Sequence, residues 1–506
     1  MTVIIDGESL TIDEVHKVAR VHEEVAIGEE CLQKIESSRK VVEKKLEEDE
    51  EVYGINTGFG ELANVKIERE KTEKLQRNLV LSHASGVGAP LDIDVVRGMM
   101  LLRANTLVKG FSGVRLKVVD TLVDMLNKGV HPVVPSQGSV GASGDLAPLA
   151  HMSLVLLGEG EALYEGKKMS GKEALKRSDI EPISLEAKEG LALLNGTQMM
   201  SAIGALAVRD AELLLKAAQI ASAMSLEALM GTSTAFDKRI HDVRPHPGQV
   251  ACASNLRRLT KHSKIIESHS QCDRVQDPYT LRCMPQVYGA AKDAIEYVKK
   301  VLDIEINSAN DNPLVFPEGD VISGGNFHGQ PISLAMDFFG AAIAEIGDIS
   351  ERTTDKLMYH EESGLPPFLA KESGLNSGFM IAQYTAASLV SENKVLAHPA
   401  SVDSIPTSAG QEDHVSMGSI AAHHARDILT NVERIVAIEL IAAAQALEYH
   451  DREPGKGVKE AYQVVREHIK PLKEDRPLHK DIEITRDLII SNELVERVEK
   501  KIGELS

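Results

Sequence analysis

The sequence predicts a mainly α-helical protein, an elongated bundle of long helices with a smaller N-terminal part. Segments at about residues 198–229, 332–358 and 416–450 are rich in Ala, Leu, Ile and Met, with widely spaced charges. Strand-like stretches are few and short, and no repeat or low-complexity tract interrupts the chain. We expect one continuous unit with an approximate boundary between an N-terminal region, 1–195, and a long-helix and C-terminal region, 196–506.

Local signals place the first elements in chain order. Residues 3–5 are typical of a short strand, and residues 6–7, Asp-Gly, form a turn. Thr11 and Glu14 make a capping box, and valines follow at helical spacing, so a helix begins there. Turn residues also predict two hairpins, at Glu165-Gly166 and at residues 317–320.

The length of the three apolar segments has a consequence for assembly. A helix of about 30 residues is about 45 Å long, which exceeds the diameter of a small domain. Helices that are apolar over most of their surface need partners to cover them. We therefore expect an obligate oligomer with two-fold symmetry, and the alternative is one large monomeric bundle.

Composition restricts the classes of partner. The formal net charge is −20, which argues against nucleic acid and anionic membrane as partners. The four cysteines form no Cys-x-x-Cys pair, which indicates reduced buried thiols. Acids interrupt the N-terminus before a signal peptide's apolar stretch, and no apolar run reaches the ~18 residues of a membrane span. These features favour a soluble cytoplasmic protein.

The segment Gly138 to Asp145 carries the most specific chemistry. It contains Ala142-Ser143-Gly144, which can form an electrophile from its own backbone. If the Gly144 nitrogen attacks the Ala142 carbonyl, a five-membered ring closes, and loss of two waters leaves a methylidene-imidazolone (MIO). Glycine permits the close backbone approach, and serine supplies the departing hydroxyl.

Other interpretations of this loop compete with ring closure. A Gly-rich loop before a helix can bind an anion. A phosphate-binding Walker loop is excluded because no Gly-Lys-Ser/Thr follows, and an esterase nucleophile elbow is excluded because Asp145 stands where glycine is required.

Six further polar segments lie between the apolar helices, and each also has a purely structural interpretation. A lone histidine such as His83 is more often structural than catalytic. Asn195 with Gly196 suits a helix cap, and a glutamate such as Glu412 suits the first turn of a helix. These six polar segments are residues 52–60, 81–88, 193–197, 276–282, 323–328 and 411–417.

The spacing of residues bears on two kinds of site, a carboxylate-binding site and a metal site. Gln276, Tyr279 and Arg282 are three residues apart, so on a helical turn they would share one face, where arginine could clamp a carboxylate. His-Glu-x-x-His is absent, and no other histidine spacing matches a metal site, so we expect no metal.

Taken together in this order, the loop and the six polar segments resemble the MIO-dependent aromatic amino-acid ammonia-lyases over nearly the whole chain. Within that family, Ser82-His83 and Gln411-Glu412-Asp413-His414 resemble the branch that acts on histidine. The resemblance implies a fumarase/aspartase-like helical fold. It also implies a homotetramer whose active sites are built from three subunits.

The resemblance also implies a reaction and residue roles. L-Histidine would lose ammonia to give trans-urocanate, the first step of histidine degradation. MIO would accept the amine, and Tyr53, or Tyr279, would take the β-proton, which requires surroundings that lower a phenol's pKa from ~10. Arg282 would bind the substrate carboxylate, and Asn195 would add a hydrogen bond to it or to the MIO oxygen. His83 and Glu412 would bind the imidazole, Gln276 and Phe327 would line the pocket, and Asp145 would position the loop.

Three rival interpretations stay open at this point. A phenylalanine or tyrosine ammonia-lyase, or an aminomutase, would use the same electrophile but different selectivity residues. A fumarase-like helical tetramer without MIO, and a non-enzymatic helical scaffold, would share the long helices but would not need Ala-Ser-Gly.

Overall fold

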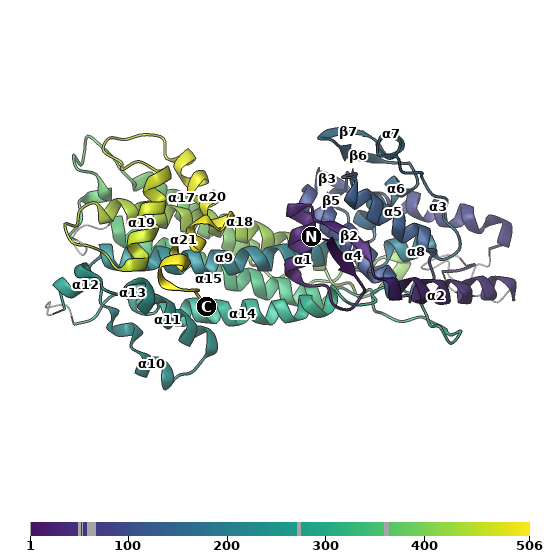
Figure 1. The fold of residues 1–506 in the computed structure, drawn as a ribbon, viewed down its shortest axis with the longest axis horizontal. Helices are drawn as coiled ribbons and strands as arrows, with labels where there is room; N and C mark the ends of the chain where they lie inside the picture. The colour runs from purple at the N-terminus through teal and green to yellow at the C-terminus, as the bar shows by residue number, and fades with distance from the viewer. Residues whose placement is uncertain (1, 49–51, 53, 58–66, 271–274, 359–363) are drawn as a thin grey trace. The chain divides into compact units, whose positions relative to one another are not determined.

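The computed structural model confirms a mainly α-helical fold (Figure 1). It describes residues 2–48, 52, 54–57, 67–270, 275–358 and 364–506. The chain forms two compact units, each assembled from three separate stretches. The first unit comprises Met1–Arg209, Lys299–Asp337 and Pro399–His423, and the second comprises Asp210–Val298, Phe338–His398 and His424–Ser506. The sequence-based boundary near residue 195 stays a prediction.

The first unit contains short strands around a set of helices. Its strands form small separate pairs or triplets, β1 with β2, β3 with β5, β4 with β6 and β7, and β8 with β9. The strands are β1 Thr2–Ile5, β2 Glu24–Ile27, β3 Val87–Pro90, β4 His131–Pro132, β5 Pro135–Gln137, β6 Glu161–Tyr164, β7 Lys167–Ser170, β8 Leu314–Val315 and β9 Val321–Ile322. The helices are α1 Ile12–His16, α2 Glu29–Glu47, α3 Thr72–His83, α4 Ile93–Val108, α5 Leu116–Asn127, α6 Ala147–Leu156, α7 Gly171–Arg177 and α8 Glu189–Leu194, with short turns at Lys17–Val21, Arg69–Lys71 and Ser408–Gly410.

The local signals are confirmed. Thr11 caps α1, and Glu14 completes the capping box. The turn at Glu165-Gly166 joins β6 to β7, and residues 317–320 lie between β8 and β9. The parallel pairing of β1 with β2 was not predicted, because it joins strands separated in the chain by α1 and a π-helical turn.

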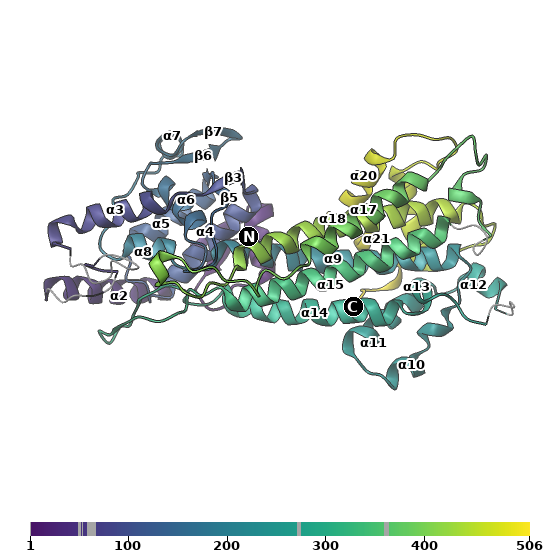
Figure 2. The same ribbon diagram turned by 180° about the vertical axis from the view of Figure 1, so that it is seen from behind.

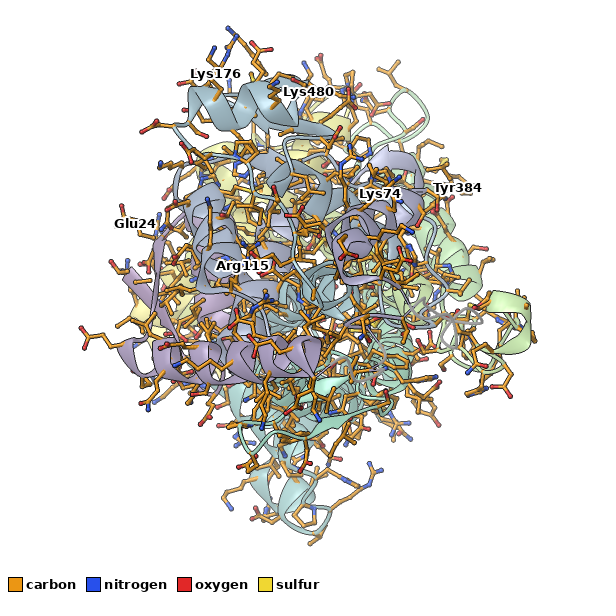
Figure 3. All side chains as sticks on the ribbon, turned by 90° about the vertical axis from the view of Figure 1, so that its right-hand side faces the viewer. Glu24, Lys74, Arg115, Lys176, Tyr384 and Lys480 are labelled. Atoms are coloured by element: carbon orange, nitrogen blue, oxygen red, sulfur yellow. The ribbon has the colours of Figure 1, made fainter. Side chains whose placement is uncertain are left out.

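The second unit is almost wholly helical. Charged side chains such as Lys480 on α20 are exposed (Figure 3). Its shorter helices are α10 Lys238–Asp242, α11 Pro247–Leu259, α12 Lys264–Ser268, α13 Tyr279–Arg282, α17 Met380–Leu396, α19 Lys456–His468, α20 His479–Ile490 and α21 Glu493–Ile502, with short turns at Ser233–Phe236 and Pro367–Leu369.

The three long helices are confirmed close to their predicted bounds, as α9 Gln198–Ala228, α15 Gln330–Met358 and α18 Gly418–Leu447. A fourth, α14 Met284–Glu305, was not among the predictions. Its charges recur from Lys292 to its end, so no long apolar segment stands out in the sequence. Within the second unit these four helices lie side by side (Figures 1 and 2), and their inward faces are buried Ala, Leu, Ile and Val.

A buried carboxyl group joins three of these helices. Glu439 of α18 is fully buried and accepts hydrogen bonds from Ser225 of α9 at 2.9 Å and Ser350 of α15 at 2.6 Å. Ser222 of α9 lies 3.2 Å from it and 2.7 Å from the hydroxyl of Tyr288 in α14. Burial raises the pKa of Glu439 to about 8, and the serine hydrogen bonds oppose this rise.

Glu439 should make the stability of the protein depend on pH. The carboxyl group loses its proton near pH 4.5 in the unfolded state and near pH 8 in the folded state. Between these two values the folded state binds more protons, so the free energy of unfolding falls as the pH rises. Glu439→Gln carries no charge at any pH. The free energy of unfolding is measured in urea at about pH 6 and at about pH 9. From the lower to the higher pH, it should fall in the native protein by on the order of a few kcal/mol more than in Glu439→Gln.

The exposed Glu267→Gln serves as the control and should keep the native pH dependence. An unchanged pH dependence in Glu439→Gln would contradict this interpretation.

Candidate active site

The Ala-Ser-Gly loop is held against the segment that precedes α9. Gly144 and Gly196 form a parallel β-bridge. The Asp145 N–H donates to the Gly196 carbonyl at 2.7 Å, and the Gly196 N–H donates to the Ser143 carbonyl at 3.3 Å. The polar segment 193–197 is therefore part of the loop's support.

Asp145 joins the loop to the start of α9. Its carboxylate is fully buried and accepts the N–H groups of Met199 at 2.6 Å and Met200 at 3.3 Å, which lie in the first turn of α9. The Ser419 hydroxyl lies 3.2 Å from the other carboxylate oxygen. Burial raises the pKa of Asp145 to about 7, while these hydrogen bonds and the charge of Arg103 oppose the rise. A carboxylate at a helix N-terminus is also favourably placed in the field of the helix.

The other side of the loop contacts the segment before α18. The Met417 N–H donates to the Val140 carbonyl at 2.9 Å, and the Ser416 hydroxyl donates to the Gly141 carbonyl at 3.0 Å. Ala142 is buried in a small apolar cluster with Val415 and Met417. The polar segment 411–417 therefore anchors the loop as well.

Position 144 accepts only glycine. A Cβ there would lie 2.0 Å from the Gly196 carbonyl oxygen, and Gly144 has a left-handed φ of +74°. Both the contact and the dihedral exclude larger residues. The backbone around Ala142-Ser143-Gly144 thus has room for no side chain at its third position.

His83 and Glu412 belong to two segments that contact this loop, and the Glu412 charge acts on His83. His83 ends α3, and its Nδ1 lies 2.9 Å from the Leu79 carbonyl. A carbonyl only accepts, so in the neutral imidazole Nδ1 carries the hydrogen and Nε2 is left as an acceptor. Burial lowers the pKa of His83, and the Leu79 carbonyl and the Glu412 charge oppose this. Glu412 is held by Thr407, whose hydroxyl donates to its carboxylate at 2.7 Å.

The polar segment 81–88 reaches the loop through a strand pair. β3 is antiparallel to β5, which ends at Gln137 directly before the loop. A Cβ on Gly138 would lie 3.0 Å from the Gly86 Cα, so these two backbones are close.

Asn195 and Phe327 also lie in the first unit. Asn195 is buried, and its Nδ2 donates to the Asn312 carbonyl at 2.9 Å. Phe327 is half-buried, and the next residue, His328, contacts the 411–417 segment: its Nε2 lies 3.2 Å from the His414 carbonyl, and the two rings stack at 5.8 Å. The structure thus brings the 323–328 and 411–417 segments together.

Four predicted residues are not joined to the loop by these contacts. Tyr53 lies outside the described residues. Gln276, Tyr279 and Arg282 belong to the second unit. Tyr279 is exposed, and the Arg282 guanidinium lies 4.5 Å from its ring centroid, so these two share a face of α13. Gln276 precedes α13, so the expected helical turn does not include it.

Sequence reasoning missed a buried polar network beneath the loop. Arg103 of α4 is fully buried and donates to the carbonyls of Ala192, at 3.0 Å, and Asn195. Asn310 accepts from Arg103 at 3.2 Å and from Gln198 at 2.7 Å. The available signals were an arginine inside an apolar helix and the polar run Asn310-Asp311-Asn312.

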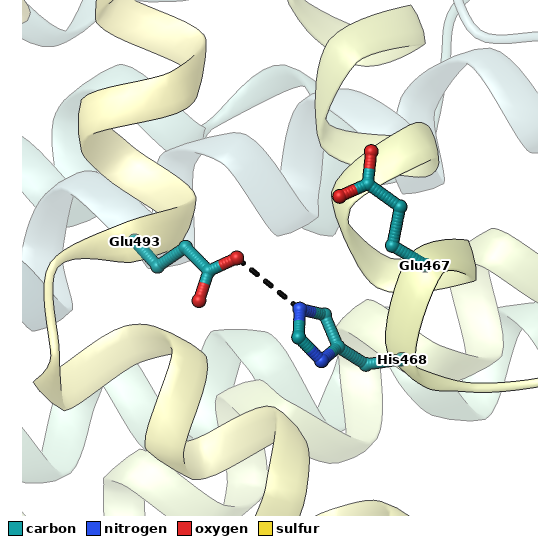
Figure 4. Close-up of side chains that lie close together, drawn as sticks. All are labelled: Glu467, His468 and Glu493. Carbon is teal, nitrogen blue, oxygen red and sulfur yellow. Dashed lines mark hydrogen bonds and ion pairs between the residues drawn. The ribbon is translucent and has the colours of Figure 1, made fainter.

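One group of potential metal ligands stands out among the described residues, and it is not at the loop. Ligand atoms of Glu467, His468 and Glu493 lie within 4.8 Å of one another (Figure 4). The His468 Nε2 is 3.1 Å from Glu493, and Glu467 accepts from Arg497 at 3.0 and 3.1 Å. Because arginine already compensates Glu467, we interpret this exposed cluster as a network of ion pairs.

Comparisons with known proteins agree with this arrangement. The sequence model of the family described as aromatic amino acid lyase matches residues 10–467. The chain is 57% identical to a protein of Alkaliphilus oremlandii named histidine ammonia-lyase, over 99% of both chains.

Solved structures give the same picture. A histidine ammonia-lyase from Trypanosoma cruzi superposes with a TM-score of 0.93 at 44% identity, covering 99% of this chain and 96% of that one. A tyrosine aminomutase from Streptomyces globisporus superposes with a TM-score of 0.95 at 37% identity, covering 100% of both. The same fold therefore occurs with different substrates, and selectivity must be argued from side chains.

The contact between residues 144 and 196 can be tested against a matched glycine. Gly144→Ala should lower the free energy of unfolding by several kcal/mol, because its Cβ would overlap a backbone carbonyl. Gly166 has a similar φ of +72° with no neighbour within 4 Å, so Gly166→Ala should cost only the dihedral strain, about 1–2 kcal/mol. Equal urea midpoints for the two variants would contradict the close contact.

Proposed function

Because the chain belongs to the aromatic amino acid lyase family, we propose that it eliminates ammonia from L-histidine to give trans-urocanate. The observation that carries this choice of substrate is that the Glu412 charge acts on His83, and that both residues belong to segments that contact the Ala-Ser-Gly loop. The full-length similarity to proteins named histidine ammonia-lyase supports it.

The cofactor proposed for this reaction is MIO, formed from Ala142-Ser143-Gly144. Support comes from the glycine-only position 144 and from the hydrogen bonds that hold the loop on both sides. Formed from these three residues, MIO would supply an electrophile for the substrate amine and an electron sink for the elimination. The chain's contribution is to position the loop, through Asp145, Ser416 and Met417.

The imidazole of the substrate is proposed to bind His83 and Glu412. A neutral substrate imidazole has one N–H donor and one acceptor nitrogen. The free Nε2 lone pair of neutral His83 and the Glu412 carboxylate both accept, so between them they would bind an imidazole N–H, or both N–H groups of an imidazolium. A phenyl or phenol ring would leave the carboxylate without that partner, at a cost in binding. This argues against the phenylalanine, tyrosine and aminomutase alternatives.

The remaining residue roles are also proposals. Arg282 would bind the substrate carboxylate, and the second N–H of the Asn195 amide would add a hydrogen bond to it. Gln276 and Phe327 would line the pocket. Tyr53 or Tyr279 would remove the β-proton, and the stacking of Arg282 on Tyr279 places a positive charge beside one of these phenols.

We also propose that complete sites form only in a homotetramer with residues from three subunits. Several large apolar side chains of the long helices and α17 are exposed in the single chain, which favours burial by other copies. They include Leu334, Phe338, Ile381 and Tyr384, the last labelled in Figure 3.

The cytoplasm is the proposed location, since Cys31, Cys252 and Cys283 are all free thiols. Among the described residues, no helix combines the length and apolarity needed to cross a membrane.

Ser143→Ala tests the cofactor. The variant lacks the hydroxyl that leaves during MIO formation, so turnover should fall by several orders of magnitude while the fold persists. The mass of the peptide containing residues 142–144 should be two waters below the sequence value in the native protein and not in the variant. Ser170→Ala, at the exposed cap of α7, should keep the native mass deficit and activity. Full activity in Ser143→Ala would exclude the MIO mechanism.

Glu412→Gln tests the choice of substrate. An amide can no longer accept a charge-assisted hydrogen bond from the imidazole, so kcat/KM for L-histidine should fall about ten- to hundredfold. The unfolding midpoint should change little, because Thr407 can still donate to the amide oxygen. The control is Glu161→Gln, on exposed β6. Unchanged histidine kinetics in Glu412→Gln would show that this residue does not bind the imidazole.

A further inference from the structure

A strained and fully buried lysine lies behind the proposed substrate site. Lys188 precedes α8 with a left-handed φ of +73°, a region that residues with a side chain seldom adopt. Its side chain has no exposure, and its Nζ donates to Asp311, also unexposed, at 2.6 Å. Such strain persists only where the surrounding structure enforces it.

The attraction within a buried ion pair such as Lys188–Asp311 is largely offset by the desolvation of its two charges. Removing two charges from water is expensive, and a buried pair is frequently no more stable than apolar side chains of similar size. Burial lowers the pKa of Lys188, and the Asp311 charge opposes this. A buried pair of this kind can instead specify one geometry, so its further contacts are informative.

Those contacts lead directly to Asn195. The second oxygen of Asp311 accepts the Asn312 N–H at 2.6 Å, and the Asn312 carbonyl accepts from the Asn195 Nδ2 at 2.9 Å. The Asn312 side chain accepts the Gly324 N–H at 2.7 Å, so the same residue also holds the segment that carries Phe327. Lys188 thus fixes Asp311, Asp311 fixes Asn312, and Asn312 holds two parts of the proposed site.

The Asn312 carbonyl also determines which way the Asn195 amide faces. A carbonyl only accepts, so the atom facing it must be Nδ2, which leaves a second N–H free to donate elsewhere. If Asn312 moved or its carbonyl turned away, the amide would lose this constraint.

We propose that Lys188 is a positioning residue, which acts through Asp311 and Asn312 to orient the Asn195 amide toward the substrate carboxylate. This inference rests on the proposed function, since it takes Asn195 as a carboxylate ligand. Lys188 itself does not contact substrate.

Lys188→Met tests the proposal, with Lys188→Met/Asp311→Asn as the second variant. The double variant avoids a lone Asp311 carboxylate, and Arg103 keeps the charge of Asp145. The amide oxygen introduced by Asp311→Asn can still accept the Asn312 N–H, so this variant provides the test if the single variant does not fold. We expect the KM for L-histidine and the inhibition constant of urocanate, which has a carboxylate, to rise about tenfold. The inhibition constant of histamine, which lacks the carboxylate, should stay within about twofold, and kcat should change less than KM.

Arg97→Met is the matched control. Arg97 is a buried cation of the same unit that donates to the Val18 and Leu126 carbonyls, at 2.9 Å each, away from Asn195. Arg97→Met should lower the free energy of unfolding, and it should change the inhibition constants of urocanate and histamine by the same factor. Equal shifts for urocanate and histamine in the Lys188 variants, or no shift for either, would overturn the proposal.

The MIO mass deficit should persist in all of these variants. A native protein that makes no urocanate from L-histidine would refute the proposed function instead, so the two failures are distinguishable.

Discussion

The close backbone contact between Gly144 and Gly196 is the constraint on which the rest of the site depends. With a Cβ at residue 144 excluded by the Gly196 carbonyl, the loop can lie flat against the segment before α9. Asp145 then reaches the first turn of α9, and Val140 and Gly141 bond the segment before α18. The starts of two long helices are thus hydrogen-bonded to the residues on either side of the tripeptide, and these bonds hold the loop in one position.

Beneath the loop the protein uses buried polar groups where apolar packing would be simpler. Arg103 donates to the carbonyls of Ala192 and Asn195 at the end of α8, and Asp311 accepts the backbone N–H of Asn312 between α14 and β8. Carbonyls that turn away from helical geometry need donors, and in a dry interior an unpaired carbonyl is costly. The polar network therefore stabilises the non-helical segments that carry the site, while apolar packing stabilises the long helices.

Local signals in the sequence predicted much of the fold and part of the site. The capping box at Thr11, the hairpin at Gly166 and three long helices depend on neighbours in the chain, and the structure confirms them. The contacts of the polar run Asn310–Asn312 and the parallel β1–β2 pairing depend on distant partners, so local patterns did not predict them. α14 was missed because its charges recur from Lys292 onward. The roles of the site residues stay predictions, and Tyr53 lies outside the described residues.

We propose that this loop carries out the elimination and that His83 and Glu412 select histidine as its substrate. The ultraviolet spectrum after separate incubation of the purified protein with L-histidine, L-phenylalanine and L-tyrosine tests this most directly. The absorption of urocanate should appear with L-histidine, and the other two should give no product. Cinnamate or coumarate in place of urocanate would contradict the assignment of His83 and Glu412, and no product from any of the three would contradict the lyase activity itself.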